Sequence, residues 1–128
     1  MLSKQISVFL ENRGGRLNQV LSVLKRANVN IMSLSLADTS DYGLLRIIVD
    51  DSEKGSKALS DNGFSAKVSL VTIVSISHHV GSLSELVNKL AEHEINVEYM
   101  YGLSLYGENA SVVIKTSDPD LTEKILGD

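Results

Sequence analysis

The chain repeats itself: residues in its first half recur in the second half at an offset of 66 positions. Identical pairs at this offset include Val8 and Val74, Gly15 and Gly81, Leu17 and Leu83, Leu24 and Leu90, and Asn30 and Asn96. Near the end of each copy the register slips by one residue, as a single extra turn residue would cause. Two copies are too few for a solenoid, so the repeat predicts a duplicated small domain.

The first copy predicts the order strand, helix, strand, strand, helix, strand. Its strands are expected at residues 5–10, 30–37, 44–49 and 64–70. The apolar residues that recur at helical spacing after the first strand are Leu17, Val20, Leu21, Leu24 and Ala27. A second helix is expected after the capping residues at 50–52, although Gly55 and Ser56 weaken it.

The second copy predicts the same order, with strands at 71–76, 96–105 and 110–116 and a first helix at 81–94. Asp118 and Pro119 are typical of the start of its short second helix. No fourth strand follows, so either this sheet has three strands or another segment completes it. An uncovered sheet edge invites pairing, which predicts self-association, as a homodimer formed through sheet edges or helices.

The repeat places the domain boundaries at residues 1–70 and 71–128. The order of elements is that of the split βαβ, or ferredoxin-like, motif. We therefore expect the α+β class, with two βαββαβ units, antiparallel sheets and helices on one face of each sheet. The second unit is expected to lack its last strand.

Composition and motifs exclude several classes of function. The chain has no cysteine, which removes thiolate chemistry and zinc–sulfur sites. A net charge of −4 without a basic block argues against nucleic acid, and no apolar run approaches the length that a bilayer requires. We expect a cytoplasmic protein without a signal peptide. No catalytic motif such as G-x-S-x-G, H-E-x-x-H or a P-loop occurs, so neither an enzyme nor a cofactor is expected.

The segment from Leu10 to Leu17, followed by Asn28-Val29-Asn30-Ile31, resembles the ACT domain, a small regulatory module of amino-acid biosynthetic enzymes. The loop is similar to that of the ACT domain in phosphoglycerate dehydrogenase, where Asn-Arg-Pro-Gly precedes the first helix and where this chain has Gly14 in place of the proline. As two copies, the resemblance covers nearly the whole chain. The whole chain is also similar to stand-alone tandem ACT proteins, which are described as amino-acid-binding or regulatory proteins.

The resemblance implies ligand sites between ACT units, made by the loop after the first strand, the start of the first helix and the residue that opens the second strand. The residues that it implies in the first copy are Asn12, Arg13, Gly14, Gly15, Leu17 and Asn30. Those that it implies in the second copy are His78, His79, Gly81, Leu83 and Asn96. Because His78 stands where the first copy has Asn12, the two sites need not prefer the same ligand.

These residue types suit an amino acid. A helix N-terminus presents unpaired N–H groups that favour a carboxylate, and glycine allows a close approach to the backbone. Asparagine offers both a donor and an acceptor to a zwitterion. We expect Asn12 and Asn30 to come together because the helix returns antiparallel to its strand.

Each of these residues also has a purely structural interpretation. The glycines and asparagines are typical of turns and of helix exits, and Arg13 and Arg16 are typical of a solvated surface. His78, His79 and His93 could bind a metal only if they met, and His93 lies at the far end of its helix, so no metal is expected. The aromatic residues of the 96–110 hairpin suit sheet packing or an interface as well as binding; with Met100 between them, they are Tyr99, Tyr101 and Tyr106.

The sequence thus predicts a regulatory protein that binds an amino acid at ACT–ACT interfaces and couples binding to one packing of the units, which is an allosteric mechanism. The alternative is a protein-interaction subunit that binds no ligand and docks on a biosynthetic enzyme.

Overall fold

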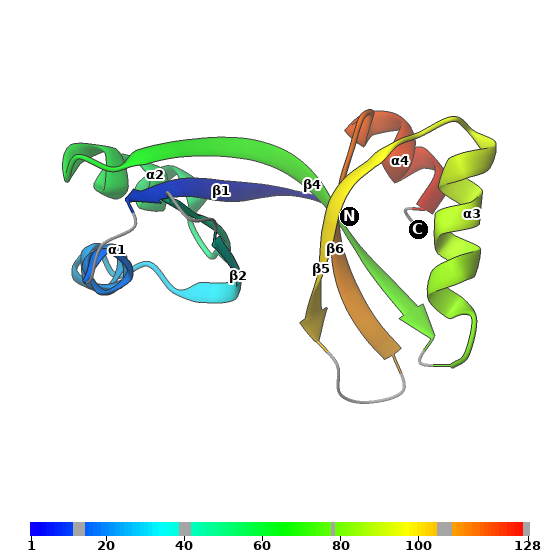
Figure 1. The fold of residues 1–128 in the computed structure, drawn as a ribbon, viewed down its shortest axis with the longest axis horizontal. Coiled ribbons are helices and arrows are strands. Elements are labelled where there is room, and N and C mark those ends of the chain that lie inside the picture. The colour runs from blue at the N-terminus through cyan, green and yellow to red at the C-terminus, as the bar shows by residue number, and fades with distance from the viewer. Residues whose placement is uncertain (12–14, 39–41, 78, 105–108, 127–128) are drawn as a thin grey trace. The chain divides into compact units, whose positions relative to one another are not determined.

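The computed structural model describes residues 1–11, 15–38, 42–77, 79–104 and 109–126, and it divides into two compact units, Lys4–Ser69 and Met1–Ser3 with Leu70–Asp128. Figure 1 shows the elements along the chain. They are β1 (Leu2–Glu11), α1 (Arg16–Arg26), β2 (Ile31–Asp38), β3 (Tyr42–Val49), α2 (Ser52–Asp61), β4 (Ser65–Ser77), α3 (Ser82–Glu92), β5 (Val97–Ser104), β6 (Asn109–Thr116) and α4 (Pro119–Leu126). Their order confirms the α+β class and the duplicated βαββα pattern. None of the described helices is both long and apolar enough to cross a membrane.

In the unit Lys4–Ser69 the strand order is β2-β3-β1-β4. β3 pairs antiparallel with β1 and β2. Alternate residues of β1 and β3 face the helices and form one buried cluster with side chains of α1 and α2. Its members from the strands include Ile6, Val8, Leu45 and Ile47, and those from the helices include Val20, Leu24 and Leu59. Both helices therefore cover the same face of the sheet, as the period-two and period-3.6 patterns require.

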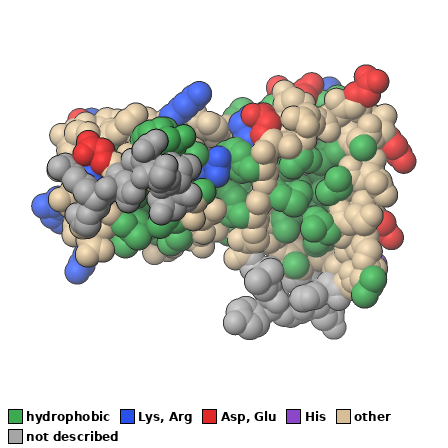
Figure 2. All heavy atoms as spheres, viewed as in Figure 1, with side chains coloured by type: hydrophobic (Ala, Val, Ile, Leu, Met, Phe, Trp, Pro, Cys, Tyr) green, Lys and Arg blue, Asp and Glu red, His purple; other side chains and the backbone are tan. Residues whose placement is uncertain are grey.

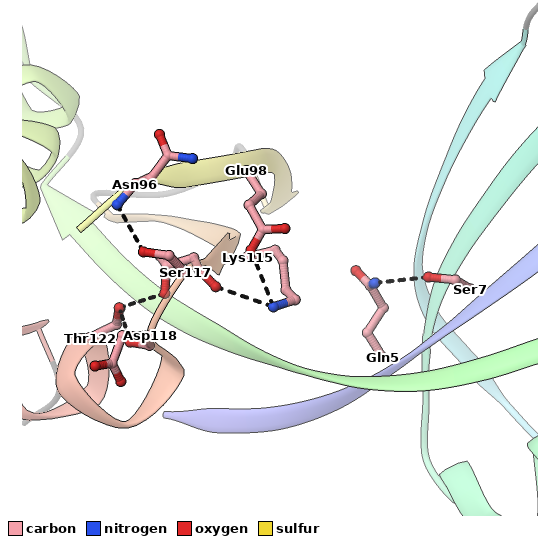
Figure 3. A network of polar contacts seen from close by, with 9 residues as sticks. Gln5, Ser7, Asn96, Glu98, Lys115, Ser117, Asp118 and Thr122 are labelled. Carbon is pink, nitrogen blue, oxygen red and sulfur yellow. Dashed lines mark hydrogen bonds and ion pairs between the residues drawn. The ribbon is translucent and has the colours of Figure 1, made fainter.

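In the other unit the order is β1-β4-β6-β5, and β6 pairs antiparallel with β4 and β5. The core cluster here is formed by Val74, Leu86, Leu90, Ile95 and Ile114. α4 is joined to β6 by a buried polar contact, in which the hydroxyl oxygens of Thr116 and Thr122 lie 2.7 Å apart. Thr122 also donates to the carbonyl of Asp118, so the buried hydroxyls are satisfied (Figure 3).

The first residues of the chain belong to this second unit. The amide of Ile73 donates to the carbonyl of Met1 at 2.9 Å, and the nitrogen of Met1 donates to the carbonyl of Ile73 at 2.8 Å. No strand follows α4 among the described residues. Of the two possibilities that the sequence left open, the structure has the second: another segment, residues 1–3, lies where a fourth strand would be.

β4 differs from the sequence-based expectation of two strands at 64–70 and 71–76, because it is one strand from Ser65 to Ser77. The run contains no glycine or proline, and β-branched residues dominate its second half. Nothing in it releases the backbone from extended geometry or removes a ladder donor. The repeat boundary therefore falls inside a strand rather than at a turn.

Gly55 lies inside α2 and is buried. A Cβ at this position would lie 3.2 Å from Cδ1 of Ile6 and 3.4 Å from Cγ1 of Val29. The glycine that weakens the helix locally therefore allows α2 to pack close to the sheet. This packing outweighs the propensity cost of about 1 kcal/mol that an internal glycine carries.

Replacing Gly55 with valine is expected to lower the free energy of unfolding by about 1–3 kcal/mol, because the added methyl groups overpack the contact with Ile6 and Val29. Gly55→Ala is the matched control: its single methyl group meets the flexible end of Ile6 and helix propensity rises, so the change should stay below about 1 kcal/mol. Urea denaturation followed by circular dichroism measures both values. A valine variant as stable as the parent would show that α2 does not need this close approach.

Candidate functional site

The first helix of each unit begins in the same unusual way. α1 follows Gly15 and α3 follows Gly81, with φ of 85° and 92°. Such positive φ strains any residue with a Cβ, which explains glycine in both copies. Space around both is open, since a Cβ built on either would meet nothing within 4 Å. Both glycines are exposed, so a small molecule can approach the backbone there.

The helices differ in how their first turns are capped. The Asp51 side chain accepts from the Lys54 amide at the start of α2, and the Asp118 side chain accepts from the Leu121 amide at the start of α4. Within the described residues, no side chain caps α1 or α3. The Ser82 amide, the first of α3, donates to the His79 carbonyl at 3.3 Å, while no side chain in the described part of the chain accepts from the first-turn N–H groups of α1 and α3. The positive end of the helix dipole favours an anion there.

A hollow of about 450 Å³ lies at the start of α3 and is lined by Ile76, Ser77, His79, Val80, Ser82, Leu83 and Ala110. The Oγ atom of Ser82 shares a hydrogen bond of 3.0 Å with Nδ1 of His79. The structure thus brings the predicted residues His79, Gly81 and Leu83 to one place. Ser82 is an addition that the sequence did not reveal, because its counterpart in the first copy is Arg16 and no repeated signal marks it.

Asn30 and Asn96 lie beyond the other ends of these helices, and both copies fold identically there. The Asn30 amide donates to Oδ1 of Asp50 at 3.0 Å, and the Asp50 amide donates back to the Asn30 carbonyl. The Asn96 amide donates to Oγ of Ser117 at 3.1 Å, with the same return bond (Figure 3). The backbone of each asparagine is thus held in place, while its side chain is exposed. Asp50 was predicted only as a helix-capping residue.

The expectation that the loop and the second-strand asparagine meet within one unit is wrong. Gly15 precedes α1 and Asn30 follows it, so the 11-residue helix separates them by about 16 Å. The start of β2 lies next to the C-terminal end of α1, whereas Gly15 lies at its N-terminal end. Asn30 instead borders a separate hollow of about 440 Å³ with Lys25, Asn28 and Asp50.

The remaining predicted residues divide into three groups. Leu17 is half-buried and packs against the first core cluster, so it contributes to stability, while its counterpart Leu83 is exposed. Asn12, Arg13, Gly14 and His78 lie outside the described residues, as does Tyr106. The expectation that the Arg16 side chain is solvated is wrong: it is half-buried, and its guanidinium carbon lies 4.5 Å from the centre of the Phe64 ring.

Two other groups of residues were considered as sites in the sequence: the histidines and the aromatic residues of the β5–β6 hairpin. Nδ1 of His93 contacts the carbonyl of Lys89 at 2.9 Å, and no group of three His, Cys, Asp or Glu residues is gathered within the described ranges. On the β5–β6 hairpin, Met100 packs against the second core cluster and Tyr99 and Tyr101 are half-buried. These positions fit sheet packing.

Comparison with known proteins agrees with this geometry. The family model of the ACT domain pair matches residues 1–127. The chain belongs to the ACT domain pair family. A protein of Bacteroides thetaiotaomicron, known from its crystal structure, is 38% identical to it, with a TM-score of 0.91; the match covers 98% of this chain and 86% of that one. The search of curated proteins found no match.

More distant structures share the fold of this ACT pair. The ligand-free regulatory subunit of aspartate kinase from Thermus thermophilus has 15% identity and a TM-score of 0.69, over 98% of this chain and 91% of that one. The corresponding subunit from Thermus flavus has 18% identity and a TM-score of 0.65, over 89% and 84%. At these identities the likeness extends to the fold alone.

Proposed function

We propose that this ACT pair is a regulatory protein without catalytic activity, which binds an amino acid at interfaces between ACT units. The observation that carries the proposal is the uncapped, glycine-entered start of α1 and of α3. A ligand carboxylate would accept from first-turn amides that no described side chain caps, and the glycines leave room for its approach. The use of aspartate caps on α2 and α4 shows that the chain can close such ends elsewhere.

The separation of Gly15 and Asn30 determines the kind of site. A molecule the size of an amino acid cannot contact both ends of an 11-residue helix. A site that uses both residues therefore takes the helix start from one ACT unit and the strand start from another. Binding would then stabilise one packing of the units, which gives the coupling that a regulatory protein requires.

The proposal extends to a homodimer formed through β2. This strand is the outermost in its unit, and Met32, Leu34 and Leu36 are 59%, 52% and 46% exposed. Figure 2 shows hydrophobic side chains reaching the surface on the face in view. An edge strand with exposed apolar residues and free backbone groups is an association site. The same edge supports the second candidate function, a ligand-free subunit that docks on a biosynthetic enzyme.

The two functions are separated by a thermal-shift screen of the twenty amino acids at millimolar concentration, followed by calorimetric titration of each hit. The regulatory function predicts saturable binding of one or a few amino acids with a raised unfolding temperature. If none of the twenty changes the unfolding temperature or gives heat, amino-acid binding is excluded and the docking function remains.

Alanine variants of Gly15 and Gly81 test the site, with the affinity for the amino acid found in the screen as the measured quantity. Gly15→Ala and Gly81→Ala are expected to weaken its binding about tenfold, or about 1.4 kcal/mol, because the new methyl group stands where the ligand approaches. Gly63→Ala is the control, since Gly63 also has φ of 85° and open space around it but does not start a helix. All three variants place alanine at a similar positive φ and so carry similar backbone strain. If Gly63→Ala weakened binding as much as Gly15→Ala and Gly81→Ala, the result would argue against the site. Titration calorimetry gives the affinities.

A further inference from the structure

A third hollow, of about 400 Å³, lies along α1 in the unit Lys4–Ser69 and extends from the first turn of the helix to its last residue. We call it the arginine hollow. Its lining includes Arg16, Gln19 and Arg26 from α1 and Asn62 and Phe64 from the segment that leads into β4. Its volume is within the range of small-molecule sites, and side chains with hydrogen-bond donors dominate its lining.

Arg16 is held in position but is not fully satisfied. Its guanidinium lies over the Phe64 ring, with the carbon 4.5 Å from the ring centre, and Nη1 donates to Oε1 of Gln19 at 2.6 Å. Its buried Nε has no hydrogen-bond partner within the described part of the chain. A guanidinium fixed by stacking holds its N–H groups in one orientation, which preorganises it to take an oxyanion.

The positive charge of Arg16 does not stabilise the start of α1. Arg16 is the first residue of α1, where the helix dipole disfavours a cation, and the first turn of α1 holds no acidic residue. Arg26 adds a second cation at the other end of the hollow, about 15 Å further along the helix axis. None of the described residues that line the hollow is acidic, although the chain as a whole carries a net charge of −4.

The second copy shows that the fold does not require this charge. At the offset of 66 residues, Glu85 stands where the first copy has Gln19, and Glu92 stands where it has Arg26. α3 therefore carries acids on the helix face where α1 carries amide and arginine side chains. The duplicated fold tolerates either charge, so the arginines of the first copy are free to serve a ligand.

We propose that the arginine hollow binds a small anionic metabolite, with a phosphate or carboxylate group at Arg16 and with the long side chain of Arg26 adding positive charge to the same hollow. The anionic group would accept charge-assisted hydrogen bonds from the Arg16 guanidinium, with Gln19 and Asn62 as further polar contacts. The hollow includes residues of the first turn of α1, but the proposal concerns another ligand and does not depend on amino-acid binding.

Calorimetric titration of the full chain at low ionic strength tests the proposal with two probes, fructose 1,6-bisphosphate for phosphates and citrate for carboxylates. Saturable binding of either is expected, and the stronger one identifies the anionic group. Arg26→Glu, which introduces the charge of the second copy, should weaken binding at least tenfold. Lys54→Glu on α2 is the control, because it makes the same charge change at an exposed position outside the hollow.

Arg16→Gln is expected to weaken binding similarly, but it also removes the stack on Phe64, so its unfolding temperature is measured in parallel. Arg26 is exposed, and its variant keeps the test valid if Arg16→Gln proves unstable. Failure of both probes to bind at 10 mM, or an equal loss with Lys54→Glu and Arg26→Glu, would overturn the proposal. The amino-acid screen uses other ligands, so its failure would leave this result unaffected.

Discussion

The double variant Leu34→Asp, Leu36→Asp is expected to be a monomer at concentrations where, under the proposed function, the parent chain is expected to be a dimer. Both leucines are about half exposed on β2, the outermost strand of its unit. Two carboxylates on this edge would have to lose water for the strands to meet, and charged residues on edge strands prevent such pairing. We expect the dissociation constant to rise at least about 100-fold, or about 2.8 kcal/mol. Sedimentation equilibrium over a concentration series measures it.

Val80→Asp is the control for this experiment, because Val80 is also an exposed apolar residue but lies before α3 rather than on β2. It should leave the dissociation constant unchanged. A parent chain that is monomeric at 100 µM, or a double variant that still dimerises, would exclude β2 as the interface. With the amino acid from the screen, loss of ligand binding in the monomeric double variant would connect the two halves of the proposed function.

Local signals in the sequence were sufficient for most of the fold. Apolar spacing in α1 and α3, aspartates before α2 and α4, and the shared offset of 66 residues each point to one geometry, and the structure has it. The one-residue slip is visible as well, since Asn30 pairs with Asp50 while Asn96 pairs with Ser117. The positive φ of Gly15 and Gly81 is the physical reason why both glycines recur.

What the sequence could not provide are relations over long distances. The pairing of Met1 with Ile73 brings together residues 72 positions apart, and no local pattern encodes it. Gly55 looked like a helix breaker because its close contact with Ile6 exists only in three dimensions. The site is a different case: the sequence already placed Gly15 before the first helix and Asn30 after it, and the expectation that they meet was an error of geometry.

The difference between a core residue and an exposed apolar residue is clearest in one cross-strand pair. Leu36 of β2 lies directly opposite Leu45 of β3, on the same face of the sheet. Leu45 is fully buried against the helices, whereas Leu36 is 46% exposed. Residue type and strand pattern are the same for both, so only the position of α1 and α2 over the inner strands assigns them different roles.

Leu45→Ala is therefore expected to lower the free energy of unfolding by about 2–5 kcal/mol, because it removes a fully buried side chain and leaves a cavity. Leu36→Ala should lower it by less than about 1 kcal/mol when measured below the dissociation constant of the dimer. Urea denaturation at several protein concentrations separates the two effects, since only the Leu36 variant should lose stability that depends on concentration. Equal losses in dilute solution would mean that β2 is part of the core, and its leucines would then no longer support a docking edge.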